Sequence, residues 1–325
     1  MVSENKSDIA SQRKFVDPDF AITNADSIKP WVDKLLEKNI SSEAEILKWL
    51  EDYSELEAII GEDMNIRYVD MTCDTKDEKK KEAYLKFVRE IQPKITEWGN
   101  ALDRKYYDSP FRKNLDDKEY GRLDRMLSSA IELYTEKNIP LSVKLAEMSQ
   151  QYQSITGGWS VEFDGKKQTM PQMSKYLFKT DRSLREGAWR AMADRRLKDS
   201  ETLENLFDKM TAARHEFALN LGLKDYREYS FKNKLRDYTP EECLEFHESI
   251  EKACVPLVRK IAARRKKQMR VDSLRPWDMS VDPLGRPPLE PFSSVDKLQD
   301  GVEEIFNKID SRLGEWFSAI RVNMD

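Results

Sequence analysis

Histidine and cysteine are scarce in this 325-residue chain, which contains 2 His and 3 Cys. Three cysteines give no disulfide framework. Cys243 and Cys254 lie on one expected helix, about 16 Å apart along its axis, whereas a disulfide needs Cα atoms within about 7 Å. We therefore expect the thiols to be small buried hydrophobes in a reducing compartment, with the cytoplasm as the default location.

Long apolar runs and an excess of positive charge are also missing. No stretch approaches the roughly 18 apolar residues of a transmembrane helix, and the first residues contain no apolar core of a secretory signal. The net charge is −5 and the sequence pI is about 5.5, so no global field would recruit nucleic acid or an anionic membrane. The sequence therefore predicts neither kind of partner.

Glycine is sparse as well, with 11 residues, whereas charged residues make up 35% of the chain and apolar residues 39%. This balance favours helices with solvated outer faces over a β-rich protein. We predict an all-α protein with one small β-hairpin. Its expected parts are a loosely held N-terminal arm (1–26), a helical N-terminal subdomain (27–150) and a helical subdomain that contains the hairpin (151–325).

Local signals mark the first helices. Two short helices are expected between Ser27 and Ile60, with Pro30 in the first turn of one of them. A longer amphipathic helix with a possible kink at Pro93 follows, and it carries Tyr84, Phe87, Val88, Ile91, Ile95, Trp98 and Leu102. An Asp-Gly turn at Asp164-Gly165, flanked by alternating residues, predicts a two-stranded hairpin that must pack on helices.

Four helices are predicted after the hairpin region, and one of them carries Leu203, Leu206, Met210, Ala213, Phe217 and Leu221 and is ended by Gly222. Asp181 caps a helix that runs to about Leu197, and Thr239-Pro240 opens another that runs to about Met269. One face of this second helix carries Cys243, Phe246, Ile250, Cys254, Leu257 and Ile261. A single last helix is expected to carry Val302, Ile305, Ile309, Leu313, Trp316 and Ile320.

The stretch Leu274–Phe292 is the only long interruption of this helical pattern. It contains Pro276, Pro283, Pro287, Pro288 and Pro291, so no helix or central strand can run through it. It also contains the apolar residues Leu274, Trp277, Met279, Val281, Leu284, Leu289 and Phe292, unlike a solvated linker. We expect this segment to be pinned across the surface of a helical body.

The spacing of the two histidines does not match the motif of a zinc hydrolase. A zinc-binding H-E-x-x-H helix needs a second histidine four residues after the first, so that both imidazoles share a face. Leu219 stands at that place after His215-Glu216, and Glu251 stands there after His247-Glu248. We interpret both histidines as ordinary residues of helix surfaces or boundaries, and the less favoured alternative is a three-ligand site formed by both histidines and a carboxylate.

Other site chemistries are also weak. There is no G-x-S-x-G nucleophile elbow. There is also no glycine-rich phosphate loop, because the pair Gly157-Gly158 is typical of a turn. Asp278 and Asp282 could bind a cation, but no third ligand is evident, and Trp277 and Trp159 are expected to anchor the core. A basic run comprises Arg259, Lys260, Arg264, Arg265, Lys266, Lys267 and Arg270. Such a run could contact a phosphate or a peptide carboxylate, but it is more typical of the solvated end of a helix.

Three ordered segments carry a family resemblance. Arg67–Thr75 followed by a charged helix, the hairpin Val161–Gly165 with Asp181–Glu186, and Val255–Leu257 leading to Leu274–Asp278 together resemble the oligoendopeptidase F-like and thimet oligopeptidase-like zinc metallopeptidases. The likeness covers about residues 45 to 325. It implies the largely helical N-terminal lobe of an ellipsoidal peptidase whose deep channel admits short peptides.

The resemblance also implies a zinc held by H-E-x-x-H and a downstream glutamate, with the motif's own glutamate as general base. No position of this chain matches those residues, so no catalytic or metal residue is assigned and the chain alone is expected to be inactive. We expect the N-terminal part of a cytoplasmic zinc metalloendopeptidase whose partners are short peptides and a missing C-terminal catalytic half. The alternative is a complete, non-catalytic helical protein for peptide binding or scaffolding. Because an apolar helix with Trp316 and Ile320 runs almost to the terminus, the first hypothesis is favoured.

Overall fold

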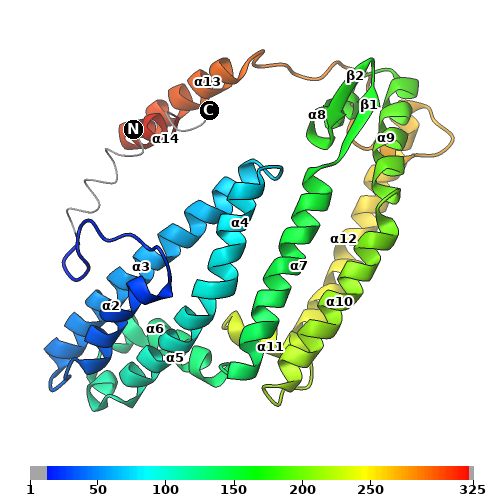
Figure 1. Ribbon diagram of the computed structural model, residues 1–325. Helices are drawn as coiled ribbons and strands as arrows, with labels where there is room; N and C mark the ends of the chain where they lie inside the picture. Colours follow the sequence, from blue (N-terminus) through cyan, green and yellow to red (C-terminus); the bar gives the residue numbers. More distant parts are fainter. Residues whose placement is uncertain (1–12, 322–325) are drawn as a thin grey trace. The chain divides into compact units, whose positions relative to one another are not determined.

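The computed structural model describes residues 13–321, and their helices and single hairpin are drawn in Figure 1. Within these residues the chain forms two compact units. The larger unit comprises residues 13–160 and 194–255, and the smaller unit comprises residues 161–193 and 256–321. The prediction of an all-α protein with one two-stranded hairpin is confirmed. None of the helices within residues 13–321 is long and apolar enough to cross a membrane.

The elements of the larger unit are mainly long helices. In chain order they are α2 (Ala25–Glu37), α3 (Glu43–Cys73), α4 (Glu78–Lys86), a π-helical turn (Phe87–Ile91), α5 (Gln92–Asp108), a 3₁₀ turn (Pro110–Asn114), α6 (Asp117–Glu132), a 3₁₀ turn (Glu136–Asn138), α7 (Ile139–Gly157), α10 (Ser200–Leu219) and α11 (Tyr226–Asn233). Two further helices, α9 (Arg182–Leu197) and α12 (Pro240–Met269), are continuous across the point where the chain passes from one unit to the other.

The smaller unit contains the hairpin and the end of the described chain. Its elements are β1 (Ser160–Phe163), β2 (Lys166–Thr169), α8 (Met170–Ser174), a 3₁₀ turn (Lys175–Phe178), a 3₁₀ turn (Pro276–Asp278), α13 (Val295–Ile309) and α14 (Ser311–Arg321). The predicted Asp-Gly turn is present: Asp164 and Gly165 have φ values of 53° and 68°, as a tight hairpin of this kind requires. Gln168 is buried, and its amide donates to the Phe163 carbonyl (2.9 Å) and to the Tyr176 hydroxyl (3.0 Å).

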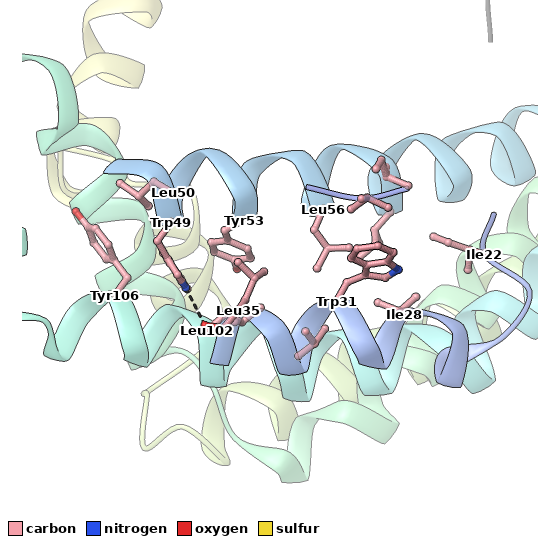
Figure 2. Close-up of a cluster of buried hydrophobic side chains, with 14 of the residues drawn as sticks. Ile22, Ile28, Trp31, Leu35, Trp49, Leu50, Tyr53, Leu56, Leu102 and Tyr106 are labelled. Carbon is pink, nitrogen blue, oxygen red and sulfur yellow. Dashed lines mark hydrogen bonds between the residues drawn. The ribbon is translucent and has the colours of Figure 1, made fainter. Parts of the chain in front are cut away.

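The main core lies where α2 packs on α3. Figure 2 shows Trp49, Tyr53 and Leu56 of α3 facing the buried residues of α2. The side chain of Trp49 is fully buried, and its indole Nε1 donates to the Leu35 carbonyl (2.9 Å), so this large ring leaves no polar atom without a partner. The prediction of two short helices is correct for α2 but wrong for α3, which runs 31 residues to Cys73. Apolar residues continue past Ile60 as far as the buried Met71, so the helix has a packed face beyond the predicted end.

Two prolines sit differently from their predicted places. Pro30 lies inside α2 and not in its first turn, because the helix begins at Ala25 with Asn24 as its cap. Pro93 follows the π-helical turn Phe87–Ile91, at the start of α5. A wider turn relieves the clash between the proline ring and the preceding carbonyls, and it removes the need for the missing N–H. The predicted kink is thus a π-bulge.

The expectation of a loosely held arm is wrong for its described part, residues 13–26. The backbone N–H groups of Lys14, Phe15 and Val16 all donate to the carboxylate of Glu55, at 2.9 to 3.0 Å. Val16 is buried, and Phe15 packs edge-on against Trp31 at 5.7 Å. A single carboxylate on α3 therefore fixes the segment against the core. Residues 1–12 of the predicted arm lie outside the described residues.

The predicted single last helix is two helices. α13 ends at Ile309, Asp310 is extended, and the Asp310 carboxylate then accepts the N–H of Arg312 at the start of α14 (2.9 Å). Phe306 and Phe317 pack edge-on at 5.5 Å, so the two helices form a hairpin. Both helices are amphipathic with the same spacing of apolar residues. The apolar periodicity in the sequence therefore continues across Asp310 and predicted a single helix.

The prediction of buried cysteines is wrong. Cys73 and Cys254 are exposed and Cys243 is half-buried. Cys73 is the last residue of α3, while the other two lie on the apolar face of α12, which carries no buried residue anywhere along its 30 residues. Spacing placed these two thiols on an apolar face correctly, but that face is not covered.

Candidate functional site

The two histidines lie on different helices and both are exposed, His215 on α10 and His247 on α12. The interpretation of both as helix-surface residues is confirmed. Residues 13–321 contain no group of three or more His, Cys, Asp or Glu side chains arranged to hold a metal ion. The described part of the chain therefore does not fit the zinc centre that the family resemblance implies.

The best-defined polar cluster is in the smaller unit, where the proline segment meets α9. The carboxylate of Asp278 is completely buried. Its oxygens accept from Arg182 Nε (3.0 Å) and Nη2 (2.9 Å), and from Arg185 Nη2 (3.2 Å). The backbone N–H of Arg275 also donates to this carboxylate, at 3.0 Å. We call this arrangement of Asp278, Arg182 and Arg185 the Asp278 clamp.

The clamp leaves little of its buried charge unsatisfied. Arg185 is itself only 2% exposed, and its remaining N–H groups donate to three backbone carbonyls, those of Trp277 (2.8 Å), Lys179 (2.9 Å) and Thr180 (2.9 Å). A buried guanidinium is tolerated only when its donors are used in this way. The hydrogen bond from Arg182, together with those from Arg275 and Arg185, lowers the pKa of Asp278 to about 2, against the effect of burial.

Two further contacts fix the same segment. Arg265 on α12 donates from Nε to the Asp278 carbonyl (2.8 Å), and its Nη2 donates to the Val281 carbonyl. The buried Trp277 ring lies 5.5 Å from the Trp189 ring, and the Arg190 guanidinium lies 5.1 Å from the Trp277 centroid. The predicted pinning of the proline segment is therefore confirmed for residues 276–281.

Beyond that point the apolar side chains are not pinned. Leu284 is 60% exposed and Leu289 is 94% exposed. Asp282 accepts the N–H of Leu284 (2.8 Å) and pairs with Arg286 (2.6 Å), and the hydrogen bond from Arg286 lowers its pKa. The cation site considered for Asp278 and Asp282 is thus wrong, because arginine side chains already neutralise both carboxylates.

The predicted tryptophan anchors differ in depth. Trp277 is buried, as expected, but Trp159 is only partly buried at the end of α7. Its Nε1 donates to the carboxylate of Asp199 (2.7 Å), which also pairs with Arg195 (2.7 Å). Trp159 therefore works as a polar link between the end of α7 and the loop before α10.

Known proteins were compared with this chain by family, by sequence and by structure. The Peptidase M3 N-terminal domain matches residues 15–133, and Peptidase family M3 matches residues 176–310. Together these matches span well over half of the chain. The chain belongs to peptidase family M3. No curated protein matches it.

Solved structures give the same fold for this M3 chain. A protein described as oligoendopeptidase F from Bacillus anthracis str. Ames has a TM-score of 0.85 at 21% identity over 95% of this chain and 57% of its own. PZ peptidase A with an inhibitor has a TM-score of 0.85 at 20% identity over 97% of this chain and 55% of its own. Oligoendopeptidase-F from Enterococcus faecium has a TM-score of 0.63 at 13% identity over 92% and 66%. The chain thus spans little more than half the length of the first two structures.

The N-terminal M3 match contains a second polar feature that the sequence did not reveal. Asp103 on α5 is buried, and it accepts a hydrogen bond from the Tyr53 hydroxyl of α3 (2.9 Å). Burial raises the pKa of Asp103 to about 6. Both residues line a pocket of about 250 Å³ together with Asn100 and Tyr134. The only sequence signal was an aspartate directly after the apolar Leu102, which marks the edge of a helix face and not a site.

Proposed function

We propose that this M3 chain is the N-terminal part of a cytoplasmic zinc metalloendopeptidase that hydrolyses short oligopeptides. The observation that carries the proposal is the pair of family matches in chain order, combined with the coverage of the solved structures. Nearly the whole of this chain aligns, whereas about half of each oligopeptidase structure remains outside the alignment. In this proposal the catalytic zinc motif belongs to that remaining half.

The role proposed for the 325 residues is one wall of the substrate channel. Long helices held together by a deep core, as in α2 and α3, make a rigid wall without needing catalytic side chains. The Asp278 clamp supports this role, because it fixes the irregular segment that follows α12 within the Peptidase family M3 match. A wall of this kind would limit the length of a peptide and not its chemistry.

The intact mass of the polypeptide in its source organism tests the proposal, with an antibody against this chain followed by mass spectrometry. We expect a species well above 38.1 kDa whose additional sequence contains H-E-x-x-H. A species of 38.1 kDa alone would refute the peptidase proposal. The non-catalytic alternative would then be tested by calorimetry with short peptides.

A second experiment tests the expected inactivity of the chain as it stands. Quenched fluorescent peptides are incubated with the purified 325-residue chain and added zinc, and the His215→Ala/His247→Ala double variant serves as the matched control. We expect no hydrolysis above buffer by either protein, because the two histidines are exposed residues of different helices. Zinc-dependent cleavage that the double variant loses would contradict this expectation.

A further inference from the structure

Helix α12 carries a long apolar face that no described residue covers. Along one face this helix carries the residues Cys243, Phe246, Ile250, Cys254, Leu257 and Ile261, which we call the α12 stripe. Phe246 is 63% exposed and Leu257 is 57% exposed, and no residue of α12 is buried. A helix is stabilised mainly by packing of its apolar face, so a stripe of this length indicates a binding surface. All six residues lie on one continuous helix.

The charges of α12 are segregated along its length. The first half contains the glutamates Glu241, Glu242, Glu245, Glu248 and Glu251, and its one lysine, Lys252, pairs with Glu248 (3.2 Å). The second half contains the cations Arg259, Lys260, Arg264, Arg265, Lys266 and Lys267, with no acidic residue among them, and Arg270 follows directly after the helix ends at Met269. Within residues 13–321, Arg265 is the only one of these seven cations whose side chain has a hydrogen-bond or ion-pair partner. A partner surface must therefore supply negative charge at one end and positive charge at the other.

The spacing of the stripe is nearly symmetric about residue 252. Positions 243 and 261 are equally distant from it, as are positions 250 and 254, and positions 246 and 257 agree to within one residue. Two copies of α12 that cross antiparallel at residue 252 would thus set apolar residue against apolar residue along the whole stripe. The same arrangement places each acidic half beside the basic half of the other copy.

We propose that the α12 stripe is a self-association surface, on which two copies of this chain pair through antiparallel α12 helices. The interface is isologous, as in most two-fold dimers, because the same patch serves both copies. Charge complementarity selects the antiparallel orientation, since parallel pairing would set the two basic halves side by side. This proposal concerns the 325-residue chain and does not rest on the peptidase proposal, although the remaining half of an M3 peptidase would compete with the second copy for the same stripe.

The flank of the stripe gives a specific ion-pair contact. Helical periodicity puts Glu242, Lys260 and Arg264 on the same side of the stripe. In the antiparallel pair, Glu242 of one copy lies opposite the interval between Lys260 and Arg264 of the other. Lys260 and Arg264 make no ion pair within the described residues, so their charges are available for this contact.

Sedimentation velocity over a concentration series tests the association. We expect a concentration-dependent species of twice 38.1 kDa that weakens at high salt. Ile250→Glu and Lys260→Glu/Arg264→Glu should each raise the dimer dissociation constant by about tenfold or more, because they put a charge in the stripe or a like charge opposite Glu242. Leu289→Glu is the matched control, since Leu289 is exposed but lies outside α12, and it should leave the constant unchanged. Circular dichroism should show that all variants keep their helix content.

Zero-length carboxyl-to-amine cross-linking of a mixture of ¹⁴N and ¹⁵N chains tests the orientation. Mixed-isotope links should join the glutamates of residues 241–251 to Lys260, Lys266 or Lys267 of the other copy. A chain that stays monomeric, a dimer that survives Ile250→Glu, or mixed-isotope links confined to other helices would each overturn the proposal. A monomer would assign the stripe to a different occupant, such as the remaining half of an M3 peptidase.

Discussion

The buried carboxylate of Asp278 makes the sharpest prediction for stability. Asp278→Asn keeps the size of the side chain but leaves Arg185, which is 2% exposed, without its anionic partner. Removing one member of a buried ion pair typically costs about 3–5 kcal/mol. The lowering of the Asp278 pKa from 3.8 to about 2 gives an independent figure of about 2 kcal/mol, at 1.36 kcal/mol for each unit. We expect a loss of about 2 to 5 kcal/mol, confined to the smaller unit.

Hydrogen exchange measured by mass spectrometry is the assay, because the two units need not unfold together. The variant should lose protection in residues 276–282 and in the first turns of α9, while the α2–α3 core exchanges as before. Asp282→Asn is the matched control on the same segment. Its partner Arg286 is 71% exposed, so breaking that pair should cost less than about 1 kcal/mol.

The pH dependence of the same difference gives a second check. A carboxyl whose pKa is lowered by folding contributes stability that is present above its ordinary pKa and is lost as pH falls toward the lowered value. The gap between wild type and Asp278→Asn should therefore be full at pH 7 and should shrink between about pH 4 and pH 2. Equal exchange for Asp278→Asn and Asp282→Asn at pH 7 would refute the reasoning about the buried clamp.

Two further predictions concern the larger unit. Burial raises the pKa of Asp103 to about 6, so its ionised form destabilises the fold at higher pH. Asp103→Asn should therefore stabilise this unit by up to about 3 kcal/mol at pH 8 and should have no such effect below about pH 4. The thermal midpoint measured against pH tests this, and an unchanged midpoint at pH 8 would contradict it. Glu55→Gln should loosen residues 14–16, because a neutral amide is a weaker acceptor for their three N–H groups, and limited proteolysis should then cut near Phe15 faster than in a Glu51→Gln control.

Local signals predicted the helices well where they were strong. The carboxylate of Asp181 caps α9, and Thr239 with Glu242 forms the cap of α12, so these starts were correct from the sequence. The ends of elements were harder. α3 passes Ile60 and the last helix breaks at Asp310, because tertiary packing decided both boundaries and the apolar periodicity did not change at either.

The absence of an H-E-x-x-H motif could be read from the spacing of the histidines alone. The polar clusters that the structure contains could not be predicted in this way. From the sequence, Asp278 could be considered only as a weak cation ligand. Its partner Arg185 is 93 residues away, so no local pattern indicated the ion pair. Only the fold brings them together. The fixation of residues 14–16 by Glu55 was invisible for the same reason, and so was the burial of Asp103 beside Tyr53. Long-range pairs of this kind carry no local pattern.

The Asp278 clamp also gives a physical reason why two distant segments carried the family resemblance together. Asp181–Glu186 supplies Arg182 and Arg185, and Leu274–Asp278 supplies the carboxylate and the Trp277 carbonyl that those arginines bind. Replacing any one of these groups would leave a buried charge or donor without its partner, at a cost of a few kcal/mol. The resemblance was therefore carried in part by residues that hold the proline segment on α9, and not by residues of a catalytic centre.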